Sequence, residues 1–453
     1  MMKDHDAESR LRRYAQAFRR EAKPLKDPAT LLAAARRGTA RPEGRFAMVP
    51  AVAMAAGVLL IGVVIAIGAW QLRALSHKAP IPPISLMTPA ATPESTATPN
   101  PSPTASAGPS PTPSGAPSGV VPGLAAIQMV GPRLGWAGGW HAIYSTSDGT
   151  HWTREYTSSE EFFGVDFISS STGWAVGVSR LLGTTDGGRS WHKLGEAPKP
   201  IRSVHFASAN SGWGIAGGDA EPGQKWPGAA AIVITTDDGG RTWRTLQAPI
   251  DPQSVCFSDG TRGWLATGSG TVYSSQDSGR NWTRSLQMTS PLAGNGWARI
   301  QCAAPSALWV YWHPGGAAGG HSPYTVYATI DGQHWRTVMT ERYTAGNEMP
   351  GVPDGPGSSS GSFSVVDPDD AVFVGDTPPA MAATCMIATN GGATLKTTGS
   401  IVGSGFTQDA AFVSTLVGWV ITIDTNGDEA IVATTDGGYH WSQQLAVQHP
   451  TGG

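Results

Sequence analysis

Runs of alternating apolar and polar residues recur over most of the last two thirds of the chain and predict β-strands. In IRSVHFAS (201–208) apolar and polar side chains alternate along much of the run, which is the pattern of a strand with one buried face. A representative stretch reads as four strands separated by turn residues: FFGVDFIS (162–169), TGWAVGV (172–178), LLGTTD (181–186) and SWHKLG (190–195). Glycine is abundant, with 58 copies, and charged residues are only 14% of the chain, a composition that fits repeated β-structure.

One short turn motif, between the predicted third and fourth strands, returns seven times. Its copies are SDGTHW (147–152), TTDGGRSW (184–191), TDDGGRTW (236–243), SQDSGRNW (275–282), TIDGQHW (329–335), ATNGGATL (388–395) and TTDGGYHW (434–441). The acidic or amide positions are Asp148, Asp186, Asp238, Asp277, Asp331, Asn390 and Asp436, and the closing aromatics are Trp152, Trp191, Trp243, Trp282, Trp335 and Trp441. Their spacing of 38 to 59 residues is the range of propeller blades.

Two further aromatic or apolar positions precede each motif. The second predicted strand carries Trp136, Trp174, Trp213, Trp264, Trp309, Phe373 and Trp419, and seven residues earlier stand Met129, Phe167, Phe206, Phe257, Cys302, Val366 and Phe412. One four-stranded sheet cannot bury both of its faces, whereas sheets arranged around an axis bury each other's. We therefore expect residues 123–449 to form an all-β, seven-bladed β-propeller of four-stranded antiparallel blades.

The turn motif has a structural explanation in this architecture. Glycines supply the positive φ of a tight turn, the aspartate accepts hydrogen bonds from backbone N–H groups of its own loop, and the tryptophan packs between neighbouring sheets. The motif resembles the Asp-box, or bacterial neuraminidase, repeat S/T-x-D-x-G-x-T/S-W. With seven boxes and GWAVG-like strands before most of them, the chain is most similar to the photosystem II assembly factor (Ycf48/Hcf136-like) propellers, and more distantly to sialidase and sortilin-type propellers.

The region before the predicted propeller contains a candidate membrane anchor. No charge occurs between Phe46 and Leu72, so we expect a single transmembrane helix at 47–72, because about 20 apolar residues span a bilayer. Residues 1–46 carry twelve Lys and Arg against six acids, whereas only Arg73 and Lys78 follow the apolar run closely. This asymmetry predicts a cytoplasmic N-terminus and an extracytoplasmic propeller at the cell membrane. A cleaved secretory signal is the alternative, but the apolar run is longer than a signal peptide's.

The segments on either side of the apolar run have different characters. Residues 1–46 read as two short basic helices, which either contact anionic lipid or dock a cytosolic regulator, as in a transmembrane sensor. Residues 73–122 are rich in Pro, Ser and Thr and predict a disordered stalk. The first 78 residues carry a net charge of +8, which leaves −11 of the total of −3 for residues 79–453. We expect no nucleic-acid partner for the acidic propeller.

Enzyme chemistry is weakly represented in the sequence. An exo-glycosidase of the sialidase class is the alternative function, but its Arg-Ile/Leu-Pro signature is matched only by Arg299-Ile300-Gln301, which lies in the fifth repeat. Box aspartates committed to separate turns cannot supply a facing pair of carboxylates. The string DTNGDE (424–429) has oxygen ligands like the start of a calcium loop, but its Asn-Gly is a hairpin-turn signal and the distal glutamate is missing. We expect no catalytic residue, metal or cofactor.

Two surfaces are candidates for ligand binding. Surplus loop length falls on the face opposite the boxes, at 217–230, 312–323, 344–361 and 375–383, and we expect Trp226, Trp312, His313 and His321 to be the contact residues there. The other candidate is a row of arginines at one position of three consecutive boxes, Arg189, Arg241 and Arg280, which would suit an acidic peptide. The resemblance implies recognition of a partner protein's chain by an arginine-rich patch. Tolerated insertions and ordinary solvated arginines are the competing explanations.

Cysteine usage leaves one question open. Cys256 and Cys302 lie in the first strands of adjacent repeats and point to opposite faces of their sheets, so they face each other across one interface. A disulfide bridge and two buried thiols both fit this placement, and Cys385 has no partner. The expected function is a membrane-anchored, non-enzymatic recognition or assembly scaffold for a protein or glycan outside the cell.

Overall fold

The structure is a computed structural model that describes residues 123–218, 230–290, 296–303, 305–316, 321–341, 347, 349–377, 382–424 and 426–447. All of these residues lie in one compact unit. The predicted cytoplasmic segment (1–46), transmembrane helix (47–72) and stalk (73–122) lie outside the described residues. Within the described part of the chain, no helix has both the length and the apolar character that a membrane span requires.

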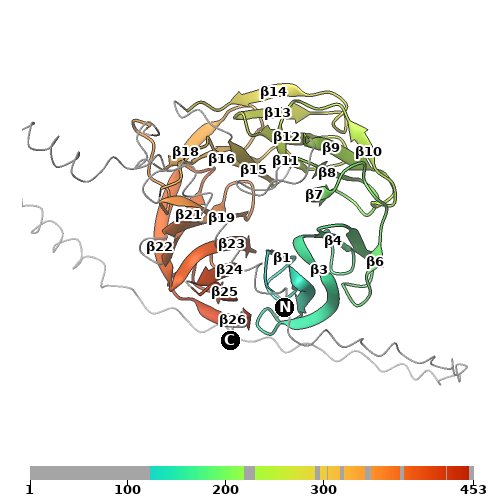
Figure 1. The fold of residues 1–453 in the computed structure, drawn as a ribbon. Helices are drawn as coiled ribbons and strands as arrows, with labels where there is room; N and C mark the ends of the chain where they lie inside the picture. Colours follow the sequence, from blue (N-terminus) through green and yellow to red (C-terminus); the bar gives the residue numbers. More distant parts are fainter. Residues whose placement is uncertain are drawn as a thin grey trace, which may run out of the picture. The chain divides into compact units, whose positions relative to one another are not determined.

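The described residues form antiparallel β-strands in six sheets that follow one another around a ring (Figure 1). The first sheet contains β1 (Ala126–Met129), β2 (Gly135–Thr146), β3 (Thr153–Phe167), β4 (Gly173–Gly177), β5 (Leu181–Thr184) and β6 (His192–Lys193). The next two contain β7 (Ile201–Phe206), β8 (Gly212–Ala216), β9 (Ile232–Thr236) and β10 (Arg244–Leu246), then β11 (Pro252–Phe257), β12 (Gly263–Thr267), β13 (Thr271–Ser275) and β14 (Thr283–Gln287). The fourth contains β15 (Trp297–Cys302), β16 (Leu308–His313), β17 (Thr325–Thr329) and β18 (Arg336–Thr340). The last two contain β19 (Ser359–Val365), β20 (Ala371–Thr377), β21 (Ala382–Thr389) and β22 (Thr394–Val402), then β23 (Ser404–Phe412), β24 (Gly418–Asp424), β25 (Glu429–Thr434) and β26 (Ser442–Val447).

The all-β propeller with four-stranded blades is confirmed, but the expected count of seven blades is wrong, because the sheets number six. The physical reason is the 15-residue strand β3. Its first half pairs with β2 and its second half, from Phe162, pairs with β4. The first two sequence repeats are therefore joined in one six-stranded sheet, while each of the other five repeats forms its own four-stranded sheet.

Aromatic pairs fill the space between successive repeats. Trp136 stacks on Phe167 and Trp174 stacks on Phe206, each with ring centroids 3.5 Å apart, and Trp213 stacks on Phe257 at 3.8 Å. The closing tryptophan of the following box meets the same phenylalanine edge-on, as Trp243 does with Phe206. Each repeat thus contributes aromatic surface to both of its neighbours, which is why tryptophan recurs with the repeat.

In four repeats the indole N–H of the second-strand tryptophan donates to a carbonyl in the box of the next repeat. Trp136 donates to the carbonyl of Gly187 at 2.9 Å, and Trp174 donates to that of Gly239 at 3.0 Å. The same bond joins Trp213 to Ser278 and closes the ring from Trp419 to Gly149. Stacking positions the sheets, and this hydrogen bond fixes the register between them.

Polar side chains cap the inner edges of the sheets. An edge strand pairs with only one neighbour, so the N–H groups on its other side need other acceptors. The inner edge strands are β1, β7, β11, β15, β19, β23 and the second half of β3. Gln128 bonds the N–H and C=O of Phe167, and Asp166 accepts from the Phe206 N–H at 2.7 Å. Burial raises the pKa of Asp166, and nearby His205 opposes that rise. These contacts supply partners for the backbone groups of Phe167 and for the Phe206 N–H at the inner edge.

Among the described strands, none is exchanged between the first and the last sheet. All four strands of the last sheet are consecutive in the chain, and β1 begins the first sheet. The two sheets are held by Asp409, which accepts from the Ile127 N–H at 3.0 Å, and by Glu429, which accepts from the Leu124 N–H. Side-chain contacts therefore replace the shared sheet that would otherwise link the two ends.

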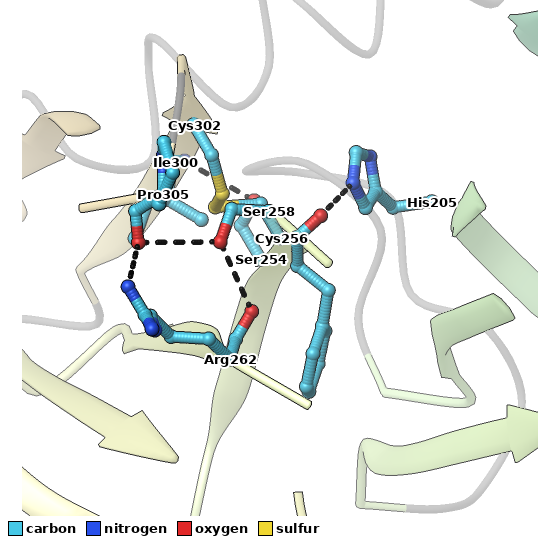
Figure 2. The surroundings of a disulfide bond; sticks show 9 residues. His205, Ser254, Cys256, Ser258, Arg262, Ile300, Cys302 and Pro305 are labelled. Atoms are coloured by element: carbon cyan, nitrogen blue, oxygen red, sulfur yellow. Dashed lines mark hydrogen bonds between the residues drawn. A yellow bond between two sulfur atoms is a disulfide. The ribbon is translucent and has the colours of Figure 1, made fainter. Parts of the chain in front are cut away.

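A disulfide joins Cys256 of β11 to Cys302 of β15, with their Cα atoms 6.0 Å apart (Figure 2). Of the two arrangements compatible with the sequence, the bridge is the one present. Cys302 occupies the position that holds Phe167, Phe206 or Phe257 in other repeats, so a covalent bond replaces the aromatic stack at this junction. Ser254 accepts from the Ile300 N–H beside it. Cys385 is a buried free thiol, and burial raises its pKa to about 11.

Candidate functional site

Each intact box is a closed hydrogen-bonded turn. In the second box the Asp186 carboxylate accepts from the Thr184 hydroxyl, the Ser190 N–H and the Ser190 hydroxyl, and the Gly188 N–H donates to Thr184. Gly187 and Gly188 have φ angles of 78° and 91°, which explains why glycine stands there. The Gly187 N–H also donates to Ser171, so the box rests on the turn between the first two strands. Equivalent bonds surround Asp148, Asp238, Asp277, Asp331 and Asp436.

Hydrogen bonds stabilise the ionised form of these carboxyl groups. Donation from the Ser190 hydroxyl and backbone lowers the pKa of Asp186 to about 2, and donation from the backbone and ring of His440 lowers that of Asp436 to about 2. The His151 backbone and ring hold the pKa of Asp148 well below its usual range. A carboxylate held this way in its own turn is a poor proton acceptor for catalysis.

The box hydrogen bonds predict a specific loss of stability in acid. The pKa of Asp186 is lower in the folded state than the value of about 3.9 in an unfolded chain, so its contribution is present above about pH 4 and disappears as pH falls toward 2. We expect Asp186→Asn to be less stable than the parent at pH 6 and equal to it near pH 2, measured by urea unfolding at each pH. Asn390→Ala, in the box without a carboxylate, is the matched control and should show a difference independent of pH. A pH-independent gap for Asp186→Asn would contradict this account.

The sixth box is built differently. Ala388 replaces the threonine, Asn390 replaces the aspartate and Leu395 replaces the tryptophan. Asn390 has a φ of 55°, and its backbone carbonyl accepts from the Ala393 N–H. The preceding second-strand indole, that of Trp309, is fully buried and its N–H has no hydrogen-bond partner. This junction therefore lacks the indole hydrogen bond that Trp136, Trp174, Trp213 and Trp419 make.

The three predicted arginines lie on neighbouring boxes and are exposed. Arg189 donates to the Asp186 carbonyl at 3.1 Å and Arg241 donates to the Asp238 carbonyl at 2.8 Å, so each guanidinium is held over its own turn. The Arg280 N–H donates to the Asp277 carbonyl in the third of these boxes. Trp174 and Trp213 connect the three boxes through the bonds described above. The structure thus places Arg189, Arg241 and Arg280 on the box turns of three successive repeats.

The predicted loop residues are placed differently from one another. Trp226 lies outside the described residues. Trp312 and His313 belong to strand β16 and are buried, and the Trp312 indole donates to the Gly268 carbonyl of the preceding sheet. Burial lowers the pKa of His313 to about 4. His321 is half-buried, with its Nδ1 3.2 Å from the buried Glu341 carboxylate.

A segment that the sequence presents as a free loop is partly tied down. The Thr340 N–H donates to Pro353, the Gly355 N–H donates to Thr340, and the Tyr324 hydroxyl donates to Gly357. Residues 349–358, here called the strap, therefore lie against the ends of β17 and β18. The glycine-rich composition of the strap predicts a loop and does not indicate this packing. At 424–429, Asp424 accepts from the Asn426 and Asp428 N–H groups, which is the geometry of a turn.

The geometry defines a propeller with Asp-boxes, and comparisons with known proteins agree. The family model for the photosynthesis system II assembly factor YCF48 matches residues 144–301. The photosystem II assembly lipoprotein Ycf48 of Synechococcus sp. (strain CC9902) is 30% identical over 132 residues, which cover 27% of this chain and 36% of that protein. The chain thus spans about a third of the length of the curated relative that it matches. The resemblance to Ycf48-like propellers, inferred from the boxes, is confirmed.

Three solved structures that this chain resembles have low sequence identity to it. YCF48 bound to D1 peptide is 17% identical with a TM-score of 0.46, covering 70% of this chain and 92% of that one. YCF48 from Cyanidioschyzon merolae is 17% identical with a TM-score of 0.44, covering 63% and 84%. A GH74 enzyme from Niastella koreensis is 16% identical with a TM-score of 0.31, covering 69% and 55%.

Proposed function

We propose that this chain is a membrane-anchored, non-enzymatic scaffold whose propeller binds a partner protein outside the cytoplasm. The observation that carries the proposal is the row of three exposed guanidinium groups on consecutive boxes, each presented by a rigid turn. Such a row suits an acidic, extended segment of a partner, because guanidinium groups bind carboxylates through paired, charge-assisted hydrogen bonds. The match to an assembly-factor family supports a protein rather than a glycan as the ligand.

The box carboxylates favour this proposal over glycoside hydrolysis. Each is bound within its own turn, whereas glycosidases place two carboxylates on either side of one bond. Arg299, the candidate for a sialidase arginine, lies in the middle of β15 and directly opposite Tyr311 of β16. No group of three or more potential metal-ligating side chains occurs within the described ranges.

The disulfide supports the predicted side of the membrane. Disulfides persist in oxidising compartments and are rare in the cytosol. A bridge between Cys256 and Cys302 therefore fits a propeller outside the cytoplasm, on a chain whose basic N-terminal segment stays inside. Photosystem II assembly is the function named for the relatives. The proposal for this chain names a partner protein and does not include the photosystem.

The proposal is tested by removing the arginine row. We expect the triple variant Arg189→Gln, Arg241→Gln, Arg280→Gln to lose about tenfold or more in affinity for the protein that the full chain captures from envelope extracts, because charge-assisted contacts are removed. Affinity is measured by quantitative pull-down at two salt concentrations. Arg154→Gln, Arg244→Gln, Arg284→Gln, which changes three exposed arginines of β3, β10 and β14, is the control. Equal capture by the two triple variants would reject the row as the binding surface.

A further inference from the structure

The Cys256–Cys302 bridge joins two strands where each enters its first turn, the turn between the first two strands of a repeat. Strand β11 leads into the turn 258–262, and β15 leads into the turn that contains Pro305. Figure 2 shows the two turns side by side next to the bridge. The bridge therefore holds the first turns of two neighbouring repeats together with a covalent bond.

Polar contacts extend this connection to the turns themselves. The Arg262 Nη1 donates to the Pro305 carbonyl at 3.1 Å, and the Ser258 hydroxyl lies 3.3 Å from the same oxygen. The Asp259 carboxylate accepts from the backbone N–H groups of Thr261 and Arg262, which fixes the shape of the turn 258–262. Among the described residues, the first turns of no other two neighbouring repeats are hydrogen-bonded to each other.

The fourth box, residues 275–282, rests on the turn 258–262 through two hydrogen bonds. The Ser278 N–H donates to the Thr261 carbonyl at 2.8 Å, and the Ser278 hydroxyl donates to the Gly260 carbonyl at 2.7 Å. Ser278 has a φ of 65°, which side chains disfavour, and it stands where the second and third boxes have glycine. Glycine can make only the backbone bond of this pair, so the fourth box is tied to its turn more firmly than those two boxes.

Arg280 depends on its box more than the other two arginines of the row. The guanidinium groups of Arg189 and Arg241 donate to carbonyls of their own boxes. Among the described residues, the Arg280 guanidinium has no hydrogen-bond or ion-pair partner. Its backbone N–H donates to the Asp277 carbonyl, so the position of the side chain follows that of the box.

We propose that the bridge, through the turn 258–262, positions the fourth box so that Arg280 binds the same acidic segment as Arg189 and Arg241. The inference rests on the proposed function and deepens it, because it gives a positioning role at the arginine row to residues that do not touch the partner. Breaking the bridge should remove the contribution of Arg280 and leave that of Arg189, which lies two repeats away. A bridge that only stabilised the fold would not distinguish the two arginines.

Amide hydrogen exchange tests the positioning without any ligand. The sample is the full chain in lipid nanodiscs, compared with the variant Cys256→Ser, Cys302→Ser. We expect the amides of residues 275–282 to exchange about fivefold faster in the variant, the effect of losing about one hydrogen bond. The equivalent amides of the second box, residues 184–191, should keep the rate of the parent.

A variant that keeps the bridge makes the test independent of its effect on stability. Arg262→Gln removes a donor to the Pro305 carbonyl and should speed exchange in the fourth box by a smaller factor than loss of the bridge. This variant applies the same test if the chain without the bridge does not fold. Arg133→Gln changes an exposed arginine in the first turn of the first repeat, and this matched control should leave the fourth box unchanged.

A labelled peptide tests the consequence for binding. The probe is fluorescein-labelled octaglutamate, followed by fluorescence anisotropy at low salt, and the triple glutamine variant of the arginine row gives the background from other basic segments. In the parent, Arg280→Gln and Arg189→Gln should each weaken binding about threefold, as suits one exposed charge contact. Without the bridge, Arg189→Gln should still weaken binding about threefold, whereas Arg280→Gln should have no further effect.

Two results would overturn the proposal. One is an unchanged exchange rate of residues 275–282 in the chain without the bridge, and the other is an equal effect of Arg280→Gln with and without the bridge. Equal binding of octaglutamate by the parent and by the triple glutamine variant would instead reject the arginine row, and the proposed function with it. The exchange rates would then decide alone whether the bridge positions the fourth box.

Discussion

Removing the Cys256–Cys302 disulfide is expected to lower the free energy of unfolding by about 4 kcal/mol. The bridge closes a loop with a sequence separation of 46 residues, and the loop-closure entropy of a chain of that length gives this value at 25 °C. The loss should appear in full because Cys302 stands where other repeats have a stacking phenylalanine, so no aromatic contact compensates. The measurement is guanidinium unfolding of the parent and of Cys256→Ser, Cys302→Ser.

Three further samples make this result specific. The parent in reductant should match the double serine variant, and Cys385→Ala, which removes the buried free thiol but keeps the bridge, should lose as much stability in reductant as the parent does. Cys256→Val with Cys302→Phe restores the aromatic residue of the repeat beside Trp264 and should recover part of the loss. An unchanged midpoint in reductant, with thiol counting to prove reduction, would show that the bridge does not support this junction.

The repeated elements of the fold could be predicted because each is encoded locally. Alternation, turn glycines and the box fix four strands in most repeats, and the boxes form the hydrogen bonds that their residue types allow. The number of sheets could not be read in the same way. Nothing in TREYTSSEEFF (153–163) marks the point where one repeat ends, so β3 runs through the boundary and joins two repeats. Whether a strand continues depends on the neighbouring strands with which its two halves pair. That pairing is a property of the tertiary structure and not of the local sequence.

The candidate binding residues show the same limit. The sequence assigned Trp312 and His313 to a loop because glycines follow them, whereas β16 extends to His313 and buries both. The strap at 349–358 has a composition typical of a loop but packs through backbone bonds, which leave no trace in side-chain patterning. By contrast, Arg189, Arg241 and Arg280 could be located by position, because each occupies a fixed place in a rigid turn.

The junctions differ in chemistry although the repeats are similar. Successive inner strands are held by an amide at Gln128, a carboxylate at Asp166, an imidazole at His205 and then the disulfide. Burial raises the pKa of Asp376, which accepts from the Thr407 N–H and hydroxyl at a later junction. Because the contact between inner strands is chemically different at each junction, a substitution can weaken one junction without altering the others.

Two second-strand tryptophans are expected to respond differently to the same substitution. Trp174→Phe removes the bond to the Gly239 carbonyl and leaves a buried acceptor unpaired, which costs about 1–3 kcal/mol beyond the lost volume. Trp309→Phe removes an indole N–H that already lacks a partner, so only the volume term remains. We therefore expect Trp174→Phe to lower the free energy of unfolding by at least 1 kcal/mol more than Trp309→Phe, measured by urea unfolding.

Alanine variants supply the control for ring packing. Trp174→Ala and Trp309→Ala both delete a fully buried ring and should each cost about 3–5 kcal/mol, because the sheets on either side cannot collapse onto the space. The phenylalanine pair thus isolates the hydrogen bond, and the alanine pair, in which Trp174→Ala also loses that bond, shows how much the ring adds at each site. Equal losses for the two phenylalanine variants would mean that the Trp174 bond adds no net stability, and that stacking alone positions each box against its neighbour. A larger loss for Trp174→Phe would assign the difference to the Trp174 hydrogen bond, which Trp309 lacks.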